Sequence, residues 1–174
     1  VVNHAHLGMQ IEGTLGDGTT LGASIRYSAE REALETAGGI ARALTLLGDA
    51  PFIAVNGDLL SDYDFSRLVR HALDQDLAHL VMVPNPAHHP MGDFALNGTR
   101  LASHGESACM HTFAGIGLYQ PRLFKDIASG QRAQLAPLLR AAMNAHRVSG
   151  EMHAGIWHDV GTPERLAALN ADMP

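Results

Sequence analysis

Apolar residues along the chain follow two alternating patterns, which predict alternating strands and helices. Short apolar runs bounded by turn residues are typical of buried strands, whereas apolar residues three or four apart are typical of amphipathic helices. The runs predict strands at residues 24–28, 52–55, 80–83, 113–119 and 156–160, and Val1-Val2 fits the end of another strand. The wider spacing predicts helices at residues 7–15, 39–47, 65–73 and 135–146, and a further helix after Thr162.

The order of these elements indicates the fold class. Strands that alternate with helices are the signature of an α/β protein, so we expect a mixed sheet whose strands are mostly parallel at first. Asn97-Gly98 lies between two short strand-like segments, and this dipeptide is typical of a tight hairpin turn. The second half of the chain should therefore add antiparallel strands. A length of 174 residues is typical of one domain, and we predict a single domain over residues 1–174.

The first candidate site follows the strand predicted at residues 52–55. Ligands of α/β sheets bind outside the carboxyl ends of the strands, where Asn56, Gly57 and Asp58 are expected. Gly57 allows a turn and a close approach by a ligand, and the Asp58 carboxylate could bind a hard cation such as Mg²⁺. Asn-Gly-Asp is also an ordinary turn sequence, so these residues could instead serve only to turn the chain.

A second carboxylate has the same placement. Asp159 ends the strand predicted at residues 156–160 and precedes the turn at Gly161. Two aspartates at strand ends, far apart in sequence, could share one metal ion, or they could be two unrelated turn residues. The parallel placement of Asp58 and Asp159 makes them our catalytic and metal-binding candidates.

Two weaker segments complete the candidates. Gly38 and Gly39 stand near the start of a predicted helix, and free N–H groups at a helix start favour anions, although packing alone can require such glycines. Asp62-Tyr63-Asp64 is similar to the metal-binding D-x-D segment of some glycosyltransferases. Because it directly precedes a predicted helix, we interpret it as an N-terminal cap.

Composition narrows the classes of partner. The formal net charge is −6, with no cluster of Lys or Arg, which argues against a nucleic acid or an anionic membrane as the main partner. A single cysteine, Cys109, excludes an internal disulfide framework and fits a reducing compartment, so we expect a cytoplasmic protein. No apolar run approaches the length of a membrane helix. The histidines are interpreted mostly as loop and surface residues.

Several of these segments, taken in order, resemble a known family, the sugar-1-phosphate nucleotidyltransferases. The resemblance is closest to the branch that transfers a uridylyl group from UTP to N-acetylmuramate 1-phosphate in peptidoglycan recycling, releasing pyrophosphate. Each segment alone is a weak signal, whereas their order and spacing cover essentially the whole chain. The segments are residues 34–40, 55–58, 62–65, 92–94, 113–116, 135–140 and 157–162.

The resemblance implies a Rossmann-like, GT-A-like α/β fold and a set of roles. Asp58 and Asp159 would hold a catalytic Mg²⁺, and Asp93 and Gly115 would contact the sugar. The substrates would be UTP and a sugar 1-phosphate. The nucleotide would be contacted by Glu35, Thr36, Gly38, Gly39, Asn56 and Gly57.

The sequence also departs from the family pattern. The family begins with a strand, a glycine-rich loop carrying an arginine, and a segment with a key lysine, none of which is present here. We therefore expect the first βα unit, with its phosphate loop, to be missing and the 174-residue chain by itself to be inactive. Two alternatives stay open: a mannose- or glucose-1-phosphate nucleotidyltransferase, and a non-catalytic module that binds nucleotide sugars.

Overall fold

The computed structural model describes residues 1–105 and 110–172. Cys109 lies outside the described residues. The chain forms two compact units, each described by itself. The first unit comprises Val1–Phe52 and Gln120–Leu139, and the second comprises Ile53–Tyr119 and Arg140–Pro174.

The first unit combines short helices with a two-stranded sheet. Strand β1 pairs in parallel with β2, with Asn3 opposite Ser28. Helix α2 supplies half of this unit's buried residues, among them Ala37 and Ile40. Its elements are β1 (Val2–His4), α1 (Gly8–Leu15), the 3₁₀ helix η1 (Thr19–Leu21), β2 (Tyr27–Ala29), α2 (Glu35–Leu47) and the 3₁₀ helix η3 (Pro121–Phe124).

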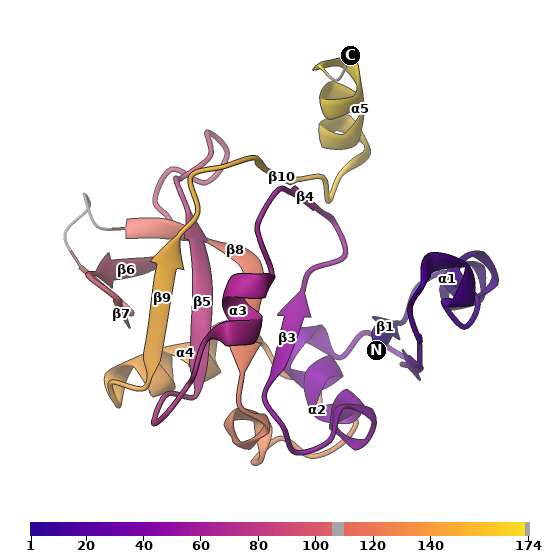
Figure 1. The fold of residues 1–174 in the computed structure, drawn as a ribbon, viewed down its shortest axis with the longest axis horizontal. Helices are drawn as coiled ribbons and strands as arrows, with labels where there is room; N and C mark the ends of the chain where they lie inside the picture. The colour runs from indigo at the N-terminus through magenta and orange to yellow at the C-terminus, as the bar shows by residue number, and fades with distance from the viewer. Residues whose placement is uncertain (106–109, 173–174) are drawn as a thin grey trace. The chain divides into compact units, whose positions relative to one another are not determined.

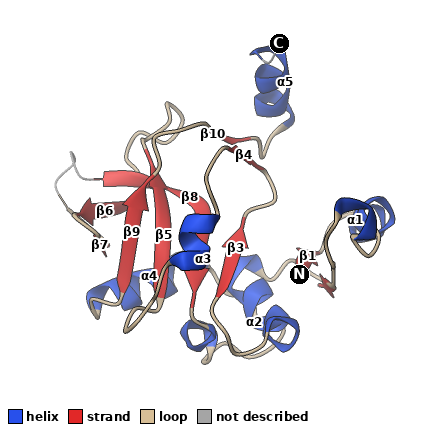
Figure 2. Ribbon diagram, in the orientation of Figure 1, coloured by secondary structure: helices blue, strands red, loops and turns tan. Residues whose placement is uncertain are grey.

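The second unit is built on a six-stranded sheet (Figures 1 and 2) with the strand order β3-β8-β5-β9-β7-β6. A separate two-stranded sheet joins β4 to β10. Helix α4 runs from one unit into the other. The strands are β3 (Phe52–Val55), β4 (Leu59–Ser61), β5 (Ala78–Val83), β6 (Phe94–Asn97), β7 (Arg100–Ala102), β8 (Met110–Tyr119), β9 (Val148–Met152) and β10 (Trp157–Asp159). The helices are α3 (Ser66–Arg70), α4 (Leu135–Asn144) and α5 (Pro163–Asp172).

The mixed α/β sheet confirms the predicted fold class, but the expectation of mostly parallel strands is wrong. Within the six-stranded sheet, β5 pairs in parallel with β9, whereas β5–β8, β6–β7, β6–β8 and β7–β9 are antiparallel. The continuous apolar runs report burial on both faces of a strand. A strand that is covered on both faces has the same apolar run whether it pairs in parallel or antiparallel, so the run does not reveal the strand direction.

The core of the second unit explains which strands are buried. All six residues of β5 are buried, because the strand lies inside the sheet between β8 and β9. Leu68 of α3 packs with Val81, Val83 and Ile116 on one face of the sheet, where Figure 2 shows α3 lying across it. Strand β3 was expected to be buried but is only half-buried, because it is an edge strand.

Element boundaries differ from the prediction where a polar residue has a structural role. Helix α3 ends at Arg70, three residues early, because His71 becomes extended and its ring stacks on buried His79 with 3.8 Å between centroids. Strands β4 and β9 were not predicted, since neither has an apolar run. The cap at Thr162 is confirmed by the bond that its Oγ1 accepts from Arg165 N at 3.3 Å.

Within the described chain, no helix is both long enough and apolar enough to cross a membrane.

Candidate functional site

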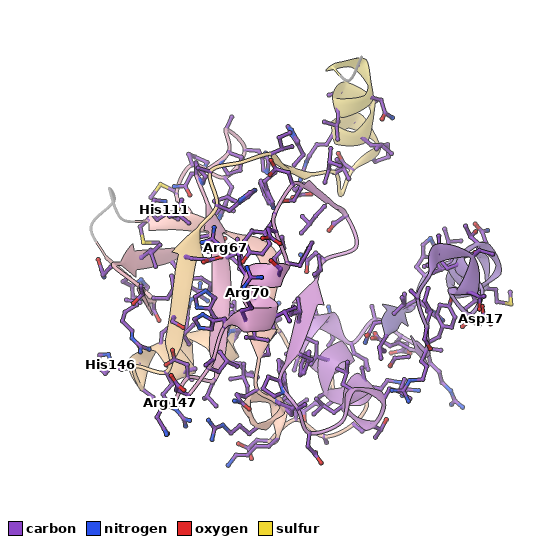
Figure 3. The ribbon with its side chains drawn as sticks, viewed as in Figure 1. Asp17, Arg67, Arg70, His111, His146 and Arg147 are labelled. Atoms are coloured by element: carbon purple, nitrogen blue, oxygen red, sulfur yellow. The ribbon has the colours of Figure 1, made fainter. Side chains whose placement is uncertain are left out.

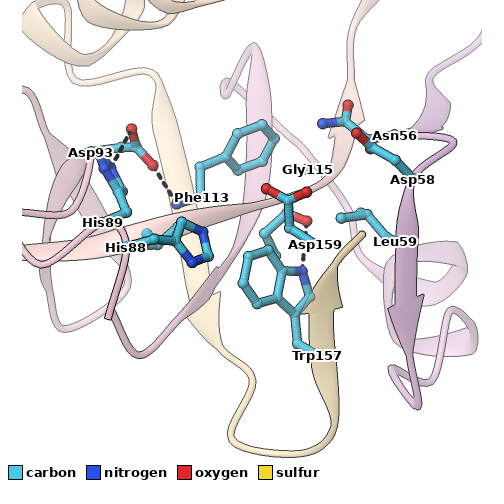
Figure 4. Close-up of a pocket in the computed structure, with 12 residues that line it drawn as sticks. Asn56, Asp58, Leu59, His88, His89, Asp93, Phe113, Gly115, Trp157 and Asp159 are labelled. Carbon is cyan, nitrogen blue, oxygen red and sulfur yellow. Dashed lines mark hydrogen bonds and ion pairs between the residues drawn. The ribbon is translucent and has the colours of Figure 1, made fainter. Parts of the chain in front are cut away.

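A cleft of about 310 Å³ lies in the second unit, at the ends of β3 and β10 and along the middle of β8 (Figure 4). Figure 4 shows Asn56 and Asp58 on one side, Asp93, His88 and His89 on the other, and Asp159 and Trp157 between them. Five of the predicted site residues are therefore collected in one cleft. Its lining consists of Asn56, Asp58, Leu59, His88, His89, Asp93, Thr112, Phe113, Ala114, Gly115, Trp157 and Asp159.

Pairing of β4 with β10 brings Asp58 and Asp159 together. Asp159 lies opposite Leu59 in this antiparallel pair, and Val160 N donates to Asp58 O at 2.8 Å. The two carboxylates converge over Gly161. Asp58 Oδ2 lies 2.7 Å, and Asp159 Oδ1 3.0 Å, from the position that a Cβ atom on Gly161 would occupy. The pairing of β4 with β10, which was not predicted, thus brings Asp58 and Asp159 close together, as was predicted.

The two carboxylates differ in how firmly they are held. Asp159 Oδ1 accepts a hydrogen bond from Gly161 N at 2.9 Å, and Asp159 Oδ2 pairs with Arg165 Nη1 at 2.6 Å. The bond from Gly161 N, and then Arg165 and the nearby His88, lower the pKa of Asp159 below its usual value. The Asp58 carboxylate is exposed and has no hydrogen bond or ion pair within the described chain. Asp159 is thus fixed and ionised, and Asp58 is available for a ligand.

Asp93 lies on the opposite side of the cleft, where its hydrogen bonds hold the loop of residues 84–93 against β8. Its Oδ2 accepts a hydrogen bond from Phe113 N at 2.9 Å, and its Oδ1 pairs with His89 Nε2 at 3.1 Å. Gly92 precedes it with φ of 64°, in a position where a Cβ atom would lie 2.9 Å from the backbone of His111. Both oxygens of Asp93 are therefore engaged, which orients His89 at the cleft wall.

The floor of the cleft requires a glycine at position 115. Gly115 has φ of 73°, and a Cβ atom there would lie 2.8 Å from Asn56 Nδ2. Its carbonyl accepts a hydrogen bond from Asn56 N at 2.9 Å, which connects the residue after β3 to β8. Trp157 Nε1 donates to Ala114 O at 2.9 Å and fixes the indole beside Asp159. Any side chain at position 115 would displace Asn56.

The predicted nucleotide-binding segment at the start of α2 lies in the first unit, where its polar groups are engaged by its own chain. Gly38 N donates to Ala133 O at 3.1 Å, and a Cβ atom on Gly38 would collide with Gln131 O. Glu35 pairs with Arg132 at 2.6 Å. Gly39 O accepts from Asn3 Nδ2 at 2.7 Å, and Thr36 is exposed. Packing thus accounts for both glycines, and a nucleotide contact by Glu35, Thr36, Gly38 or Gly39 stays a prediction.

Gly57, by contrast, is exposed with open space around it, between Asn56 and Asp58 at the cleft. In the D-x-D-like segment, Asp64 Oδ1 accepts from Ser66 N at 2.9 Å at the start of α3, and Asp62 pairs with His153 at 3.0 Å. Neither Asp62 nor Asp64 lines the cleft. Asp64 thus bonds the first residue of α3, but the N-cap position is held by Phe65, so the segment does not supply the predicted N-terminal cap itself.

Sequence reasoning missed His88 and His89 as cleft residues. No spacing distinguished them from the other histidines, and only their position shortly before Gly92-Asp93 could have drawn attention to them. Both line the cleft, and His89 reaches Asp93 because the two residues are four apart in a turn closed by the bond from His89 N to Pro86 O at 2.9 Å.

The donor set of the cleft fits a hard cation that is shared with a substrate. Among the described residues, no group of three or more His, Cys, Asp or Glu side chains is arranged to hold a metal ion. Two convergent carboxylates, Asp58 and Asp159, still match Mg²⁺, which commonly binds one or two protein carboxylates and completes its shell with water and substrate phosphates.

Comparison with known proteins places this geometry in a family. The nucleotidyl transferase family model matches residues 1–174. The N-acetylmuramate alpha-1-phosphate uridylyltransferase of Neisseria meningitidis serogroup B is 49% identical over 178 residues, covering 98% of this chain and 76% of the relative. The mannose-1-phosphate guanylyltransferase of Mycobacterium tuberculosis is 27% identical over 171 residues, covering 93% of this chain and 48% of the relative.

The fold has solved counterparts as well. A Bacillus anthracis protein assigned as a glucose-1-phosphate thymidylyltransferase, crystallised with sucrose, matches with a TM-score of 0.79 at 19% identity, covering 97% of this chain and 74% of that one. At this identity the likeness establishes the fold alone, and it agrees with the α/β architecture implied by the sequence segments. Because the family match spans the whole chain, the protein belongs to the nucleotidyl transferase family and is a transferase.

Proposed function

We propose that the protein to which this chain belongs transfers a uridylyl group from UTP to N-acetylmuramate 1-phosphate, giving a UDP-sugar and pyrophosphate, as a step of peptidoglycan recycling in the cytoplasm. The observation that carries the proposal is the 49% identity, over 98% of the chain, to an N-acetylmuramate alpha-1-phosphate uridylyltransferase. The cleft supports it with two convergent carboxylates at strand ends, Asp58 and Asp159.

In this reaction the protein neutralises and orients the phosphates and forms no covalent bond to the substrates. A phosphate oxygen of the sugar phosphate forms a bond to the α-phosphorus of UTP, and the bond from that phosphorus to the pyrophosphate oxygen breaks. Mg²⁺, when bound, offsets negative charge on the phosphates and orients them for in-line displacement. Asp58 and Asp159 would hold the ion, which fits one carboxylate that is fixed and one that is free.

The remaining predicted residues have proposed roles in binding. Asn56 and Gly57 contact the nucleotide beside Asp58. Gly115 and Asp93 shape the sugar side of the cleft, Gly115 by leaving space and Asp93 by orienting His89. In the proposal, Glu35, Thr36, Gly38 and Gly39 contact the base and ribose.

Pyrophosphate release by the full-length gene product tests the proposal. The enzyme is incubated with Mg²⁺ and three substrate pairs: UTP with N-acetylmuramate 1-phosphate, GTP with mannose 1-phosphate, and dTTP with glucose 1-phosphate. We expect the first pair to have the highest kcat/KM, and EDTA to abolish turnover. A preference for either other pair would contradict the proposed substrate, and binding without turnover would favour a non-catalytic module.

A further inference from the structure

We propose that His88 determines which sugar the cleft accepts, by donating a hydrogen bond to the carboxylate of an acidic sugar substituent. This inference rests on the proposed function, because it assigns a residue to the part of N-acetylmuramate that neutral sugars lack. That part is the lactyl ether, which carries a carboxylate. The lactyl carboxylate and the sugar's phosphate both offer anionic oxygens to His88. The experiment must therefore distinguish a bond to the carboxylate from a bond to the phosphate.

The lining of the cleft is rich in negative charge. Three carboxylates line the cleft, those of Asp58, Asp93 and Asp159, and no Lys or Arg side chain is among its lining residues within the described chain. An extra carboxylate on the substrate would be repelled by this lining unless a donor met it. A cleft that accepts an acidic sugar therefore needs at least one polar hydrogen available on its sugar side.

The donors of the cleft can be counted. Trp157 Nε1 is bonded to Ala114 O, Thr112 Oγ1 donates to Asn85 Oδ1 at 2.9 Å, and His89 Nε2 is paired with Asp93. Among the side chains that line the cleft, the donors without a hydrogen-bonding partner in the described chain are those of Asn56 and His88. Asn56 lies beside Asp58, on the side proposed for the nucleotide. The available donor on the opposite side is His88.

The loop that carries His88 is held in place. Asn85 Nδ2 donates to Pro90 O at 3.1 Å and to Met110 O at 3.0 Å, which closes the loop onto β8. His89 and Asp93 pin its other end. His88 itself is exposed and makes no hydrogen bond within the described chain, although it lies near enough to Asp159 to affect that carboxylate. A fixed backbone with a free imidazole is suited to ligand recognition.

Position favours the lactyl carboxylate over the sugar's phosphate. The phosphates are expected at Asp58 and Asp159, and Figure 4 shows His88 between Asp159 and His89, on the side of Asp159 that faces away from Asp58. A sugar whose phosphate lies at the two aspartates would extend toward that side. An imidazole N–H can donate to a carboxylate whether the ring is neutral or charged, so the recognition does not depend on titration of His88.

The experiment compares two sugars that differ only in the lactyl ether. The kcat/KM for UTP with N-acetylmuramate 1-phosphate is divided by that with N-acetylglucosamine 1-phosphate, for the wild type and for His88→Ala, His88→Gln and His88→Glu. We expect His88→Ala to lower this ratio about tenfold, because it removes a hydrogen bond to a charged group. His88→Glu should lower it further, and His88→Gln, which keeps an N–H donor, should restore part of it.

His146→Asn is the matched control, since His146 lies in the turn between α4 and β9, away from the cleft lining (Figure 3). This control should leave the ratio unchanged. An unchanged ratio in His88→Ala would overturn the inference. If kcat/KM fell by the same factor for both sugars, His88 would be assigned to the phosphate that they share. A wild type that turns over neither sugar with UTP would overturn the proposed function as well, so the two failures are distinguishable.

Discussion

Two glycine-containing segments were predicted to bind ligand, but they differ in whether their polar groups are hydrogen-bonded within the chain. At the start of α2, the Gly38 N–H, the Gly39 carbonyl and the Glu35 carboxylate all bond to their own chain. At the end of β3, Gly57 has open space around it, and the Asp58 carboxylate has no partner within the described chain. One segment is closed by internal packing, and the other presents unmatched polar groups.

The comparison teaches how to separate structural from functional polar residues when both follow the same local pattern. A buried polar group must be hydrogen-bonded, so internal bonds are expected wherever a segment serves the fold. A carboxylate such as Asp58, at a strand end and without a partner, contributes little to the fold and remains available to a ligand. Substitutions in the two segments should therefore affect different properties: stability in the first and catalysis in the second.

Asp58→Asn should have the largest effect. Removing the charge should lower kcat about 10³-fold, because a metal ion shared with the phosphates would lose one of its two carboxylates. The melting temperature should stay nearly constant, since the side chain makes no bond within the described chain. Steady-state kinetics and thermal unfolding measure the two effects. Asp49→Asn, at an exposed position of the first unit, is the charge-matched control.

Gly161→Ala should have the next largest effect. Its methyl group would enter the space between the Asp58 and Asp159 carboxylates, at 2.7 and 3.0 Å from their oxygens, and push them apart. We expect kcat to fall about 10- to 100-fold and the Mg²⁺ requirement to rise, although no charge changes. Gly13→Ala in α1, where a Cβ atom meets nothing within 4 Å, is the control. Wild-type kinetics in Gly161→Ala would mean that the two carboxylates do not act on one ion.

Gly38→Ala tests the closed segment. The added methyl would collide with Gln131 O, so we expect a loss of about 1–3 kcal/mol in the free energy of unfolding. Gly13→Ala should instead be neutral or stabilising by up to about 1 kcal/mol, because its methyl has space in a helix. Chemical denaturation measures both. Unchanged stability with a weaker affinity for UTP would show that Gly38 serves the nucleotide rather than the packing.

His79 is a structural residue that departs from the rule of complete internal bonding. Its Nδ1 bonds to Ser149 Oγ at 2.9 Å, but its buried Nε2 has no hydrogen bond within the described chain. Burial, and then the neighbouring His71, lower the pKa of His79 to about 4. The fold therefore favours neutral His79, so stability is complete above the unfolded-state pKa of about 6.5 and is lost as the pH falls toward 4.

The expected loss is about 1 kcal/mol between about pH 7.5 and pH 5.5. Denaturation at a series of pH values measures this loss. In His79→Gln the free energy of unfolding should change less between these pH values, whether the variant is more or less stable than the wild type. His146→Asn, which replaces a histidine at an exposed position, is the control substitution. A wild-type slope in His79→Gln would assign the acid sensitivity to other groups.

The sequence predicted most of the fold and the carboxylate pair, for identifiable reasons. Buried runs such as β5 and the capped start of α5 depend on local patterns, and both were predicted. Strands β4 and β9 were missed because their stability comes from long-range pairing rather than from an apolar run. His88 and His89 were missed for the same reason, since only the folded loop brings them to the cleft beside Asp93.

We expect Asp58 and Asp159 to share one divalent cation with the nucleotide, and a crystal of the full-length enzyme grown with UTP and Mn²⁺ would show whether they do. Anomalous scattering from manganese would locate the ion without reference to any assumed chemistry. One ion should be bonded to a carboxylate oxygen of Asp58, a carboxylate oxygen of Asp159 and phosphate oxygens of UTP. An ion that contacts the phosphates but neither aspartate, or only one of them, would contradict it.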